Sequence, residues 1–328
     1  MLKKRKTLKE IAKEAGVSIT AASLFLNGRA GQYRLSQELC SRLEAIFARE
    51  NYTPNINARA MNAKNTGLIG CILREEIQYS FWAEIYSGLD ATLSQNKLHL
   101  LPTLSRSNMK NEMAAFDFLR DKGVDAYVWV PMFTPGGKTN ERKVREYMAE
   151  KPVISMTCHI PDMPGVCVDE SHGAQLALQH LLDLGHRRMA VMGDSQIYAR
   201  AKHFIAYGEG AGVSVVSCKK AKDVLQAYKA GKITAVFCFS DNRAFEIYQL
   251  CAEQHIRIPE DLSIIGYDNL PTTQYFFPPL TTIHQPKYEL GESTGQLLLN
   301  ILNGNACPRQ IKLAPTLVLR KSTAPPKI

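Results

Sequence analysis

The chain has 328 residues, of which 45% are hydrophobic and 22% charged. This is the composition of ordinary globular proteins, so disordered and collagen-like chains are excluded, and the length suits two or three domains. No apolar run reaches the roughly 18 residues that a transmembrane helix needs. Lys and Arg number 40 against 31 Asp and Glu, which gives a formal net charge of +9.

The positive charge is concentrated at the N-terminus. Residues 1–64 carry 12 basic and five acidic side chains, a net +7, whereas the remainder carries +2. A localised basic segment is typical of a surface that meets a polyanion. The basic start Lys3–Lys6 could belong to a signal peptide, but the charges between Lys9 and Glu14 interrupt the apolar run that export requires. We therefore expect an unexported, cytoplasmic protein.

The eight cysteines are scattered and form no C-x-x-C pair. In a reducing compartment they are most simply small, buried apolar side chains. A zinc site could be imagined at Cys158, His159, Cys167 and His172, but the spacing fits no common ligand pattern and prolines lie between these residues. We expect no metal and no cofactor.

The first residues contain the signals of a helix-turn-helix. Thr7 and Glu10 have the spacing of a capping box, and Gly16 suits the left-handed position that ends a helix. Ser18 can cap a second helix after a link of about three residues, which is the helix-turn-helix spacing. A third helix begins after Ser36.

Two interpretations of these helices are open. They form either a small helical knob with a solvated basic surface or a DNA-binding head. In the second case the second helix enters the major groove and basic side chains neutralise phosphates. The local +7 charge favours the head. After it, Pro54 suits the first turn of a helix too short to be stable by itself, so something outside the chain must order it.

Several segments of this region carry the signature of a known family: residues 7–12, 15–18, Ser23, Leu26-Asn27 and Tyr52-x-Pro54-Asn55-x-x-Ala58-Arg59. They resemble the head and hinge of the lac repressor (LacI/GalR) family. The resemblance implies a recognition helix at about Ser18 to Leu26 in the major groove. It also implies a hinge helix in the minor groove, with Met61 wedged between base pairs.

The resemblance also implies which residues contact DNA: Thr7, Ser18, Ile19, Thr20, Ser23, Asn27, Arg34, Tyr52, Asn55, Ala58, Arg59 and Met61. The recognition helix departs from the family and loses two polar groups that could touch DNA, because Ala21 replaces a threonine and Leu24 an arginine. Base readout then depends on Ile19, Thr20 and Ser23, through a methyl contact or a hydroxyl.

From residue 65 onward, apolar runs alternate with helical patterns. The predicted strands are Leu68–Leu73, Leu98–Leu104, Ala126–Val130, Val153–Thr157, Met189–Gly193, Ala235–Phe239 and Ser263–Tyr267. The predicted helices are 81–95, 110–122, 140–150, 172–184, 199–207, 220–230 and 242–255. This alternation predicts parallel sheets covered on both faces, and about ten strands fit two doubly wound lobes better than one sheet. We therefore expect an all-α helix-turn-helix head plus an α/β core.

The expected organisation has three parts. Residues 1–50 form the head, residues 51–64 the hinge and residues 65–328 the core, with lobe boundaries near 158–160 and 283–286. Ligands of such folds bind at the carboxyl ends of strands or between lobes. Polar residues at these ends are Arg200, Asp241, Asp268 and Gln285; each alone is more often a helix cap or surface charge, but together they indicate a site.

The family resemblance extends through the core on residues 77–84, 168–169, 181–188, 259–269 and 279–283. It implies a core like that of periplasmic sugar-binding proteins, a homodimer, and an effector, commonly a sugar or purine, in the interlobe cleft. The effector contacts that it implies are Tyr79, Phe81, Arg200, Asp241, Asp268 and Gln285. The glycines from Gly208 to Gly212 predict a helix stop rather than a phosphate cradle. The stretch from there to Ala235 is shorter than usual, which predicts a trimmed lobe.

Three classes of function remain to be compared. A transcription regulator, acting as a repressor, would bind a palindromic operator in double-stranded DNA as a homodimer, with its affinity modulated by a sugar or related metabolite. An enzyme is disfavoured because nucleophile elbow, dinucleotide fingerprint, P-loop and metal quartet are missing, and Asp169, Ser171 and His172 are merely adjacent in sequence. A solute-binding protein is disfavoured by the basic head and the missing export signal. No heptads follow Leu319, so we expect a dimer, without membrane contact.

Overall fold

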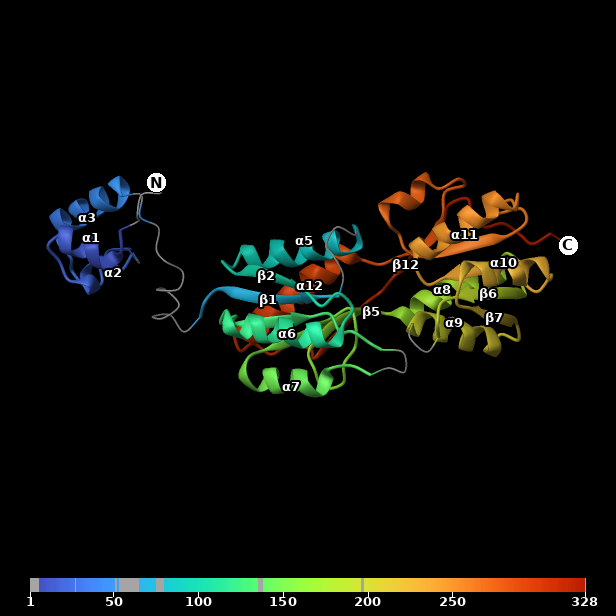
Figure 1. Ribbon diagram of the computed structural model, residues 1–328, viewed down its shortest axis with the longest axis horizontal. Helices are drawn as coiled ribbons and strands as arrows, with labels where there is room; N and C mark the ends of the chain where they lie inside the picture. Colours follow the sequence, from blue (N-terminus) through green and yellow to red (C-terminus); the bar gives the residue numbers. More distant parts are fainter. Residues whose placement is uncertain are drawn as a thin grey trace. The chain divides into compact units, whose positions relative to one another are not determined.

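The computed structural model describes residues 6–26, 28–50, 52, 65–74, 80–134, 138–195 and 198–327. The chain divides into two compact units, Met1–Thr66 and Gly67–Ile328, which we call the head and the core. Figure 1 shows helices in the head and layers of helix and sheet in the core.

The head is built from α1 (Leu8–Glu14), α2 (Ile19–Leu26) and α3 (Gln37–Arg49). Thr7, Ser18 and Ser36 each accept a hydrogen bond from a backbone N–H in the first turn of the helix that follows. Gly16 has a φ of +66°, which a glycine adopts without strain, and this lets the chain turn sharply between α1 and α2. An apolar cluster closes the head: Ile11, Ala12, Ala15, Ala22, Leu43, Ile46 and Phe47. Full burial of one of its larger side chains stabilises the fold by about 1.5–3 kcal/mol.

The first lobe of the core is a parallel sheet with the strand order β11-β5-β4-β3-β1-β2. Its strands are β1 (Leu68–Leu73), β2 (His99–Leu104), β3 (Ala126–Trp129), β4 (Val153–Met156), β5 (Gly165–Val168) and β11 (Gln310–Leu313). Its helices are α5 (Ser80–Ser94), α6 (Met109–Asp121), α7 (Glu141–Glu150) and α12 (Lys287–Leu302).

Side chains of this sheet alternate between its two faces. Ile69 and Cys71 of β1 pack with α5 and α12, whereas Ile72 packs with α6 and α7. Figure 1 shows the two pairs of helices on opposite sides of the sheet. Because both faces are covered, β1 is apolar at nearly every position instead of alternating with polar residues.

The second lobe is a sheet with the strand order β12-β10-β9-β8-β6-β7. Its strands are β6 (Arg188–Met192), β7 (Ser214–Cys218), β8 (Ala235–Cys238), β9 (Ser263–Asp268), β10 (Thr281–His284) and β12 (Thr316–Val318). Its helices are α8 (Glu170–Asp183), α9 (Ala199–Gly210), α10 (Ala221–Lys229), α11 (Asp241–Glu253) and the short η1 (Pro271–Tyr275). Met189 faces α8 and α9, and Ala190 faces α10 and α11.

These observations confirm the predicted fold class, a helical head with two parallel-sheet lobes. One strand departs from it, because β12 runs antiparallel to β10. The predicted trimming of the second lobe is not seen: the short stretch after α9 still forms β7 and α10, which complete one edge of the sheet. In the part of the chain that the structure describes, no helix is long and apolar enough to cross a membrane.

The chain passes between the lobes at three places. It leaves the first lobe between β5 and α8, returns between β10 and α12, and leaves again between β11 and β12. The boundary predicted near 158–160 is therefore too early, because β5 still pairs with β4 in the first sheet. Pro161 and Pro164 just before β5 are not typical of a strand, so this four-residue strand was not predicted. The third passage, between β11 and β12, was not predicted either.

Candidate DNA-binding surface and effector site

The second helix of the head presents an exposed polar and apolar face. Ser18 caps α2, its Oγ accepting a hydrogen bond from the N–H of Ala21 over 3.1 Å. The next two predicted readout residues are exposed, Ile19 to 47% of its full area and Thr20 beside it. Ser23 is half-buried, whereas Ala22 is fully buried and Phe25 packs against the apolar cluster of the head. α2 is thus anchored by one face and offers the other.

Two predicted DNA contacts also have structural duties. The hydroxyl of Thr7 accepts from the N–H of Glu10 over 3.3 Å, while the N–H of Thr7 donates to the carboxylate of Glu10 over 2.7 Å. This is the predicted capping box, and it orients the start of α1. Tyr52 packs on Phe47 with ring centroids 5.3 Å apart, so its ring belongs to the apolar cluster of the head.

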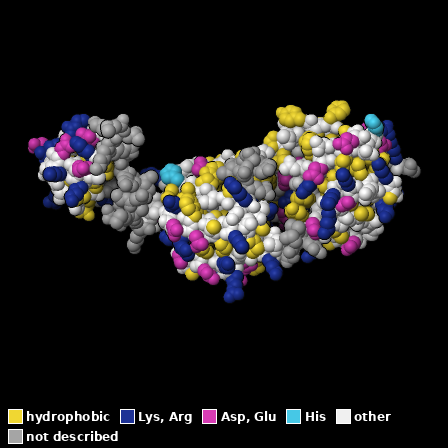
Figure 2. Space-filling model, in the orientation of Figure 1, with side chains coloured by type: hydrophobic (Ala, Val, Ile, Leu, Met, Phe, Trp, Pro, Cys, Tyr) yellow, Lys and Arg dark blue, Asp and Glu magenta, His cyan; other side chains and the backbone are white. Residues whose placement is uncertain are grey.

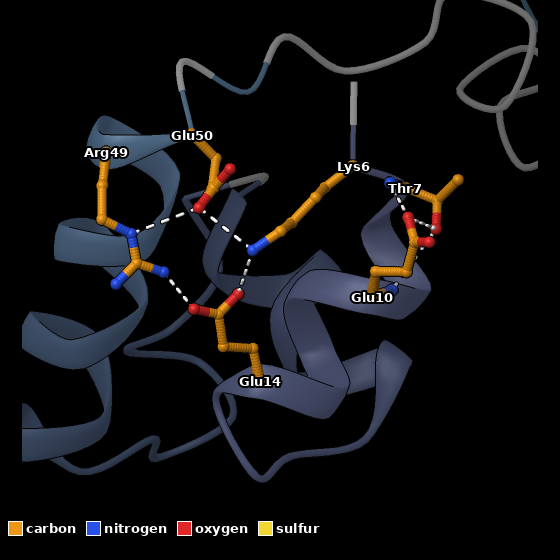
Figure 3. Close-up of polar contacts among 6 residues, drawn as sticks. All are labelled: Lys6, Thr7, Glu10, Glu14, Arg49 and Glu50. Atoms are coloured by element: carbon orange, nitrogen blue, oxygen red, sulfur yellow. Dashed lines mark hydrogen bonds and ion pairs between the residues drawn. The ribbon is translucent and has the colours of Figure 1, made fainter. Parts of the chain in front are cut away.

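An ionic network ties α1 to the end of α3, as Figure 3 shows. Lys6 donates to Glu14 over 2.8 Å and to Glu50 over 3.0 Å, and Arg49 pairs with the same two carboxylates. Hydrogen bonds from Lys6 and then Arg49 lower the pKa of Glu14 below its usual value. Lys6 and Arg49 are therefore compensated within the head and add little to its attraction for a polyanion.

Other basic side chains of the head are exposed: Lys9, Lys13, Arg29, Arg34 and Arg42. Figure 2 shows Lys and Arg side chains on the visible face of the head. Tyr33 is also exposed beside Arg34. Outside the described residues lie the predicted contacts Asn27, Asn55, Ala58, Arg59, Met61 and Tyr79.

In the core, three of the predicted effector residues come together. The Nη1 of Arg200, at the start of α9, lies 3.3 Å from Oδ1 of Asp268 at the end of β9. The Nε2 of Gln285, just after β10, donates to the same oxygen over 2.6 Å. Because parallel strands end at one edge of their sheet, residues far apart in sequence meet there. We call this group, with Glu170, the strand-end site.

Glu170 is the member of this site that the sequence analysis missed. Its Oε1 accepts from Nη2 of Arg200 over 2.6 Å and from Nε over 3.2 Å. Glu170 is the first residue of α8, directly after the Asp169 cap, so an acidic residue there is also explained by the helix dipole. Because the helix dipole already explains an acid at this position, the sequence gives no sign of the contact between Glu170 and Arg200, 30 positions away.

Arg200 is held on every side. Its guanidinium lies 3.9 Å from the centroid of the Tyr267 ring, and Nη1 also donates to the carbonyl of Phe239 over 2.8 Å. Burial opposes the charge on Arg200, but the carboxylates of Glu170 and Asp268 outweigh it and raise its pKa further. Burial also opposes the charge on Asp268 and so raises its pKa, whereas Arg200 and Gln285 favour the charged form.

The backbone at Asp268 adopts a conformation that L-residues rarely take, with φ of +111°. Such a conformation costs about 1–3 kcal/mol and persists only where the surroundings enforce it. Lys287, at the start of α12, donates to the carbonyl of Asp268 over 2.8 Å, and its side chain is 1% exposed. Lys287 also lies 3.6 Å from the carboxylate of Glu84 on α5, so it joins the first lobe to the strand-end site.

Two predicted effector residues are placed differently. Asp241 is 1% exposed, and its two oxygens accept from the N–H of Leu270 over 2.8 Å and the hydroxyl of Thr282 over 2.6 Å. Its carboxylate holds the loop after β9 to β10, so both of its oxygens already have partners within the lobe, and its contact with an effector stays a prediction. Phe81 lies against the apolar core of the first lobe, with its ring 5.1 Å from that of Trp82.

Asp169 and Ser171 have structural roles at the start of α8. Among the described residues, no group of three or more His, Cys, Asp or Glu side chains is arranged to hold a metal ion. Asp169 caps α8 by accepting from the N–H of His172 over 3.1 Å. The hydroxyl of Ser171 bonds to that of Tyr207 over 2.5 Å. These contacts fasten α8 and do not assemble a nucleophile with a base.

The fold and the two sites together define a class of protein: a helix-turn-helix regulator with a two-lobed binding core. The family model for bacterial regulatory proteins of the lacI family matches residues 7–55. A model for periplasmic binding protein-like domains matches residues 178–323.

Whole-chain relatives give the same answer. The ribose operon repressor of Haemophilus influenzae is 30% identical over 96% of this chain and 98% of its own length. The lac repressor dimer, bound to operator and the anti-inducer ONPF, has the same fold, with a TM-score of 0.83 and 22% identity over 98% of this chain and 100% of that one. A ribose-bound LacI-family regulator from Enterococcus faecalis V583 is 27% identical over 79% of this chain and 100% of its own, with a TM-score of 0.66. The chain belongs to the lacI family of bacterial regulatory proteins, which are DNA-binding transcription regulators and not enzymes.

Proposed function

We propose that this regulator is a cytoplasmic repressor that binds a palindromic operator as a homodimer, and that a sugar bound between the lobes changes its affinity for DNA. The observation that carries the DNA-binding half is the exposed face of α2, on a helix whose opposite face is locked into the head. Ser18, Ile19 and Thr20 on that face would meet base edges and phosphates in the major groove.

Direct base readout by this helix is sparse. Ile19 offers a branched apolar surface that suits a thymine methyl group, and Thr20 offers one hydroxyl. A large share of affinity must then come from phosphate contacts, which exposed cations such as Arg34 would make. Indirect readout by the hinge, which includes Met61, would add specificity through DNA bending.

The experiment is selection of binding sites from random duplexes with the full chain, followed by titration with salt. A two-fold symmetric sequence should emerge, and about six to ten phosphate contacts should make log affinity fall steeply with log salt. Thr20→Ala should change the base preference at one base pair. Arg34→Ala should weaken binding to all DNA sequences alike and lower the slope of log affinity against log salt by about one. Lys110→Ala, an exposed cation of the core, is the control. A flat salt dependence would exclude the DNA-binding proposal.

The effector half of the proposal is supported by the strand-end site. Asp268 and Gln285 offer the convergent polar groups that sugar hydroxyls need, and Arg200 is held rigidly among them. Ribose is the first probe, because a ribose operon repressor and a ribose-bound regulator are among the relatives. An effector can shift DNA affinity only by its differential affinity for two lobe arrangements, usually about 1–3 kcal/mol.

Thermal-shift screening of the full chain against sugars and nucleobases tests this half. A ligand at 100 times its Kd should stabilise the protein by about 2.7 kcal/mol. Asp268→Asn should remove the response, and operator affinity should change when the effector is added. A response that survives Asp268→Asn would place the ligand elsewhere.

A homodimer is supported by an aromatic patch on the second lobe, formed by Phe245, Tyr275, Phe276 and Phe277. Phe277 is 96% and Tyr275 80% exposed, and Phe276 packs against Phe245 with ring centroids 5.3 Å apart. Figure 2 shows hydrophobic side chains projecting from one edge of this lobe. Clustered exposed aromatics usually mark a protein interface.

A further inference from the structure

Most N–H donors of the Arg200 guanidinium are already paired within the protein itself. Its Nε and Nη2 donate to Glu170, and its Nη1 donates to the carbonyl of Phe239 and lies 3.3 Å from Asp268. The side chains of Arg200, Glu170 and Asp268 are mostly buried. All three nitrogens of the group therefore already have oxygen partners.

A free guanidinium in this position would attract anions. Arginine presents a planar fork of donors that matches phosphate and carboxylate groups, and low dielectric strengthens the attraction. Here two carboxylates contact the guanidinium, and the nearby ammonium of Lys287 donates to the backbone carbonyl of Asp268. An incoming phosphate would have to displace Glu170 and would still face the charge of Asp268.

We propose that Glu170 determines specificity: by sequestering Arg200 it makes the strand-end site reject anionic ligands and accept an uncharged, hydroxyl-bearing effector. This inference rests on the proposed function, because it assumes that the strand-end site holds the effector. Sugar hydroxyls would donate to the carboxylates of Glu170 and Asp268, which in their ionised form can only accept hydrogen bonds. A sugar phosphate would meet the same oxygens as like charges.

A purely structural role for the ion pair between Glu170 and Arg200 would be to join α8 to α9. These helices already share buried apolar contacts that include Ala174, Ala201 and Phe204. The hydroxyls of Ser171 and Tyr207 also bond across them. The helices are thus held together without Glu170, which leaves the neutralisation of Arg200 as the distinctive effect of its charge.

The test compares ribose with ribose 5-phosphate by titration calorimetry on the full chain. The wild-type protein should prefer ribose, and Glu170→Gln should shift the ratio of the two affinities toward the phosphate by about tenfold, the size of one charge-assisted hydrogen bond. Glu170→Asp keeps the charge and should keep the wild-type ratio. Glu209→Gln, an equal change of charge at an exposed site on α9, should also leave it unchanged.

The outcomes separate this inference from the proposed function. If ribose binds but Glu170→Gln leaves the ratio unchanged, or if the wild-type protein takes ribose 5-phosphate as well as ribose, Glu170 is only structural. If no sugar binds any version, the proposed function fails and this inference falls with it. Inorganic phosphate is a sugar-free probe: at equal ionic strength it should protect Glu170→Gln from thermal unfolding more than it protects Glu209→Gln, and equal protection would count against the inference.

Discussion

Glu112 on α6 is a buried carboxylate in the first lobe that helix periodicity does not distinguish from surface acids. It accepts hydrogen bonds from Nε1 of Trp129 over 2.9 Å, the N–H of Met132 over 3.1 Å and Nδ2 of Asn140 over 2.7 Å. Burial raises the pKa of Glu112, and these donors work in the opposite direction. One side chain thus joins the end of β3, Met132 after it and Asn140 just before α7.

Glu112→Gln should destabilise the protein, because the amide NH₂ would replace an acceptor that faces only donors. We expect a loss of about 1–3 kcal/mol in the free energy of unfolding. Urea denaturation measures this loss, with Glu146→Gln, a change at an exposed position on α7, as the control. Equal stability of the two variants would show that Glu112 is not needed to join these residues.

At the same scale, the residues of the strand-end site divide by how they could be found. Arg200, Asp268 and Gln285 follow strands and match family positions, so sequence reasoning reached them. Glu170 and Lys287 acquire their roles from partners on other elements, at 2.6 Å and 2.8 Å respectively. No local pattern marks such a partner: the helix N-terminus already accounts for Glu170, and Lys287, a cation that a helix N-terminus does not favour, carries no local sign of its distant partners.

At the scale of elements, α5 and α12 approach each other closely through glycines. A Cβ on Gly291 would overlap the carbonyl oxygen of Ile85, and one on Gly88 would overlap that of Tyr288. Because the atoms in the way belong to the backbone, no side-chain rotation can relieve the overlap. This contact joins the first helix of the lobe to the helix that returns from the second lobe.

Gly291→Ala should therefore destabilise the core by about 1–3 kcal/mol or more, as overpacking does. Gly210→Ala is the control, because space around Gly210 at the end of α9 is open. Thermal unfolding should separate the two variants. An unchanged midpoint for Gly291→Ala would mean that the helices can move apart freely.

The C-terminal segment is held to the second lobe by His186. Its Nδ1 lies 2.7 Å from the hydroxyl of Thr234 and its Nε2 lies 2.9 Å from the carbonyl of Ala324. Burial lowers the pKa of His186 below its ordinary value of 6.5. The neutral ring is therefore favoured in the folded chain.

This shift predicts a pH dependence of stability. The unfolded chain takes up a proton at a higher pH than the folded one, so the contribution of His186 is complete above about pH 6.5 and is lost as the pH falls toward the folded pKa. His186→Gln should be less stable at neutral pH but should lose less on acidification. Parallel stability curves for variant and wild type, measured by urea denaturation across this range, would contradict the assignment.

At the scale of the whole molecule, the aromatic patch predicts how copies assemble. Phe277→Ser with Tyr275→Ser should weaken dimerisation by more than about tenfold, since exposed aromatics near an interface centre carry much of its energy. Phe118→Ser, which removes an exposed aromatic of the first lobe, is the control. Sedimentation equilibrium measures both. A dimer unaffected by the double change would place the interface on another surface.

The amino-acid sequence by itself determined the class of this protein and most of its elements. Capping residues, apolar runs and the polar ends of strands are local signals, and each depends on only a few neighbouring residues. Thus the helix-turn-helix, the strands from β1 to β4 and the group of Arg200, Asp268 and Gln285 were all predictable.

Tertiary structure decided what depends on distant partners. Short strands such as β5 and β12 form only because a sheet edge is there to pair with, and α12, which the strand–helix alternation did not predict, forms against α5. Asp241 and Glu170 are both acids next to helix starts, yet one is enclosed within its lobe and the other neutralises Arg200. Only the packing of elements separates these two cases, because burial and charge pairing are set by what lies nearby in space.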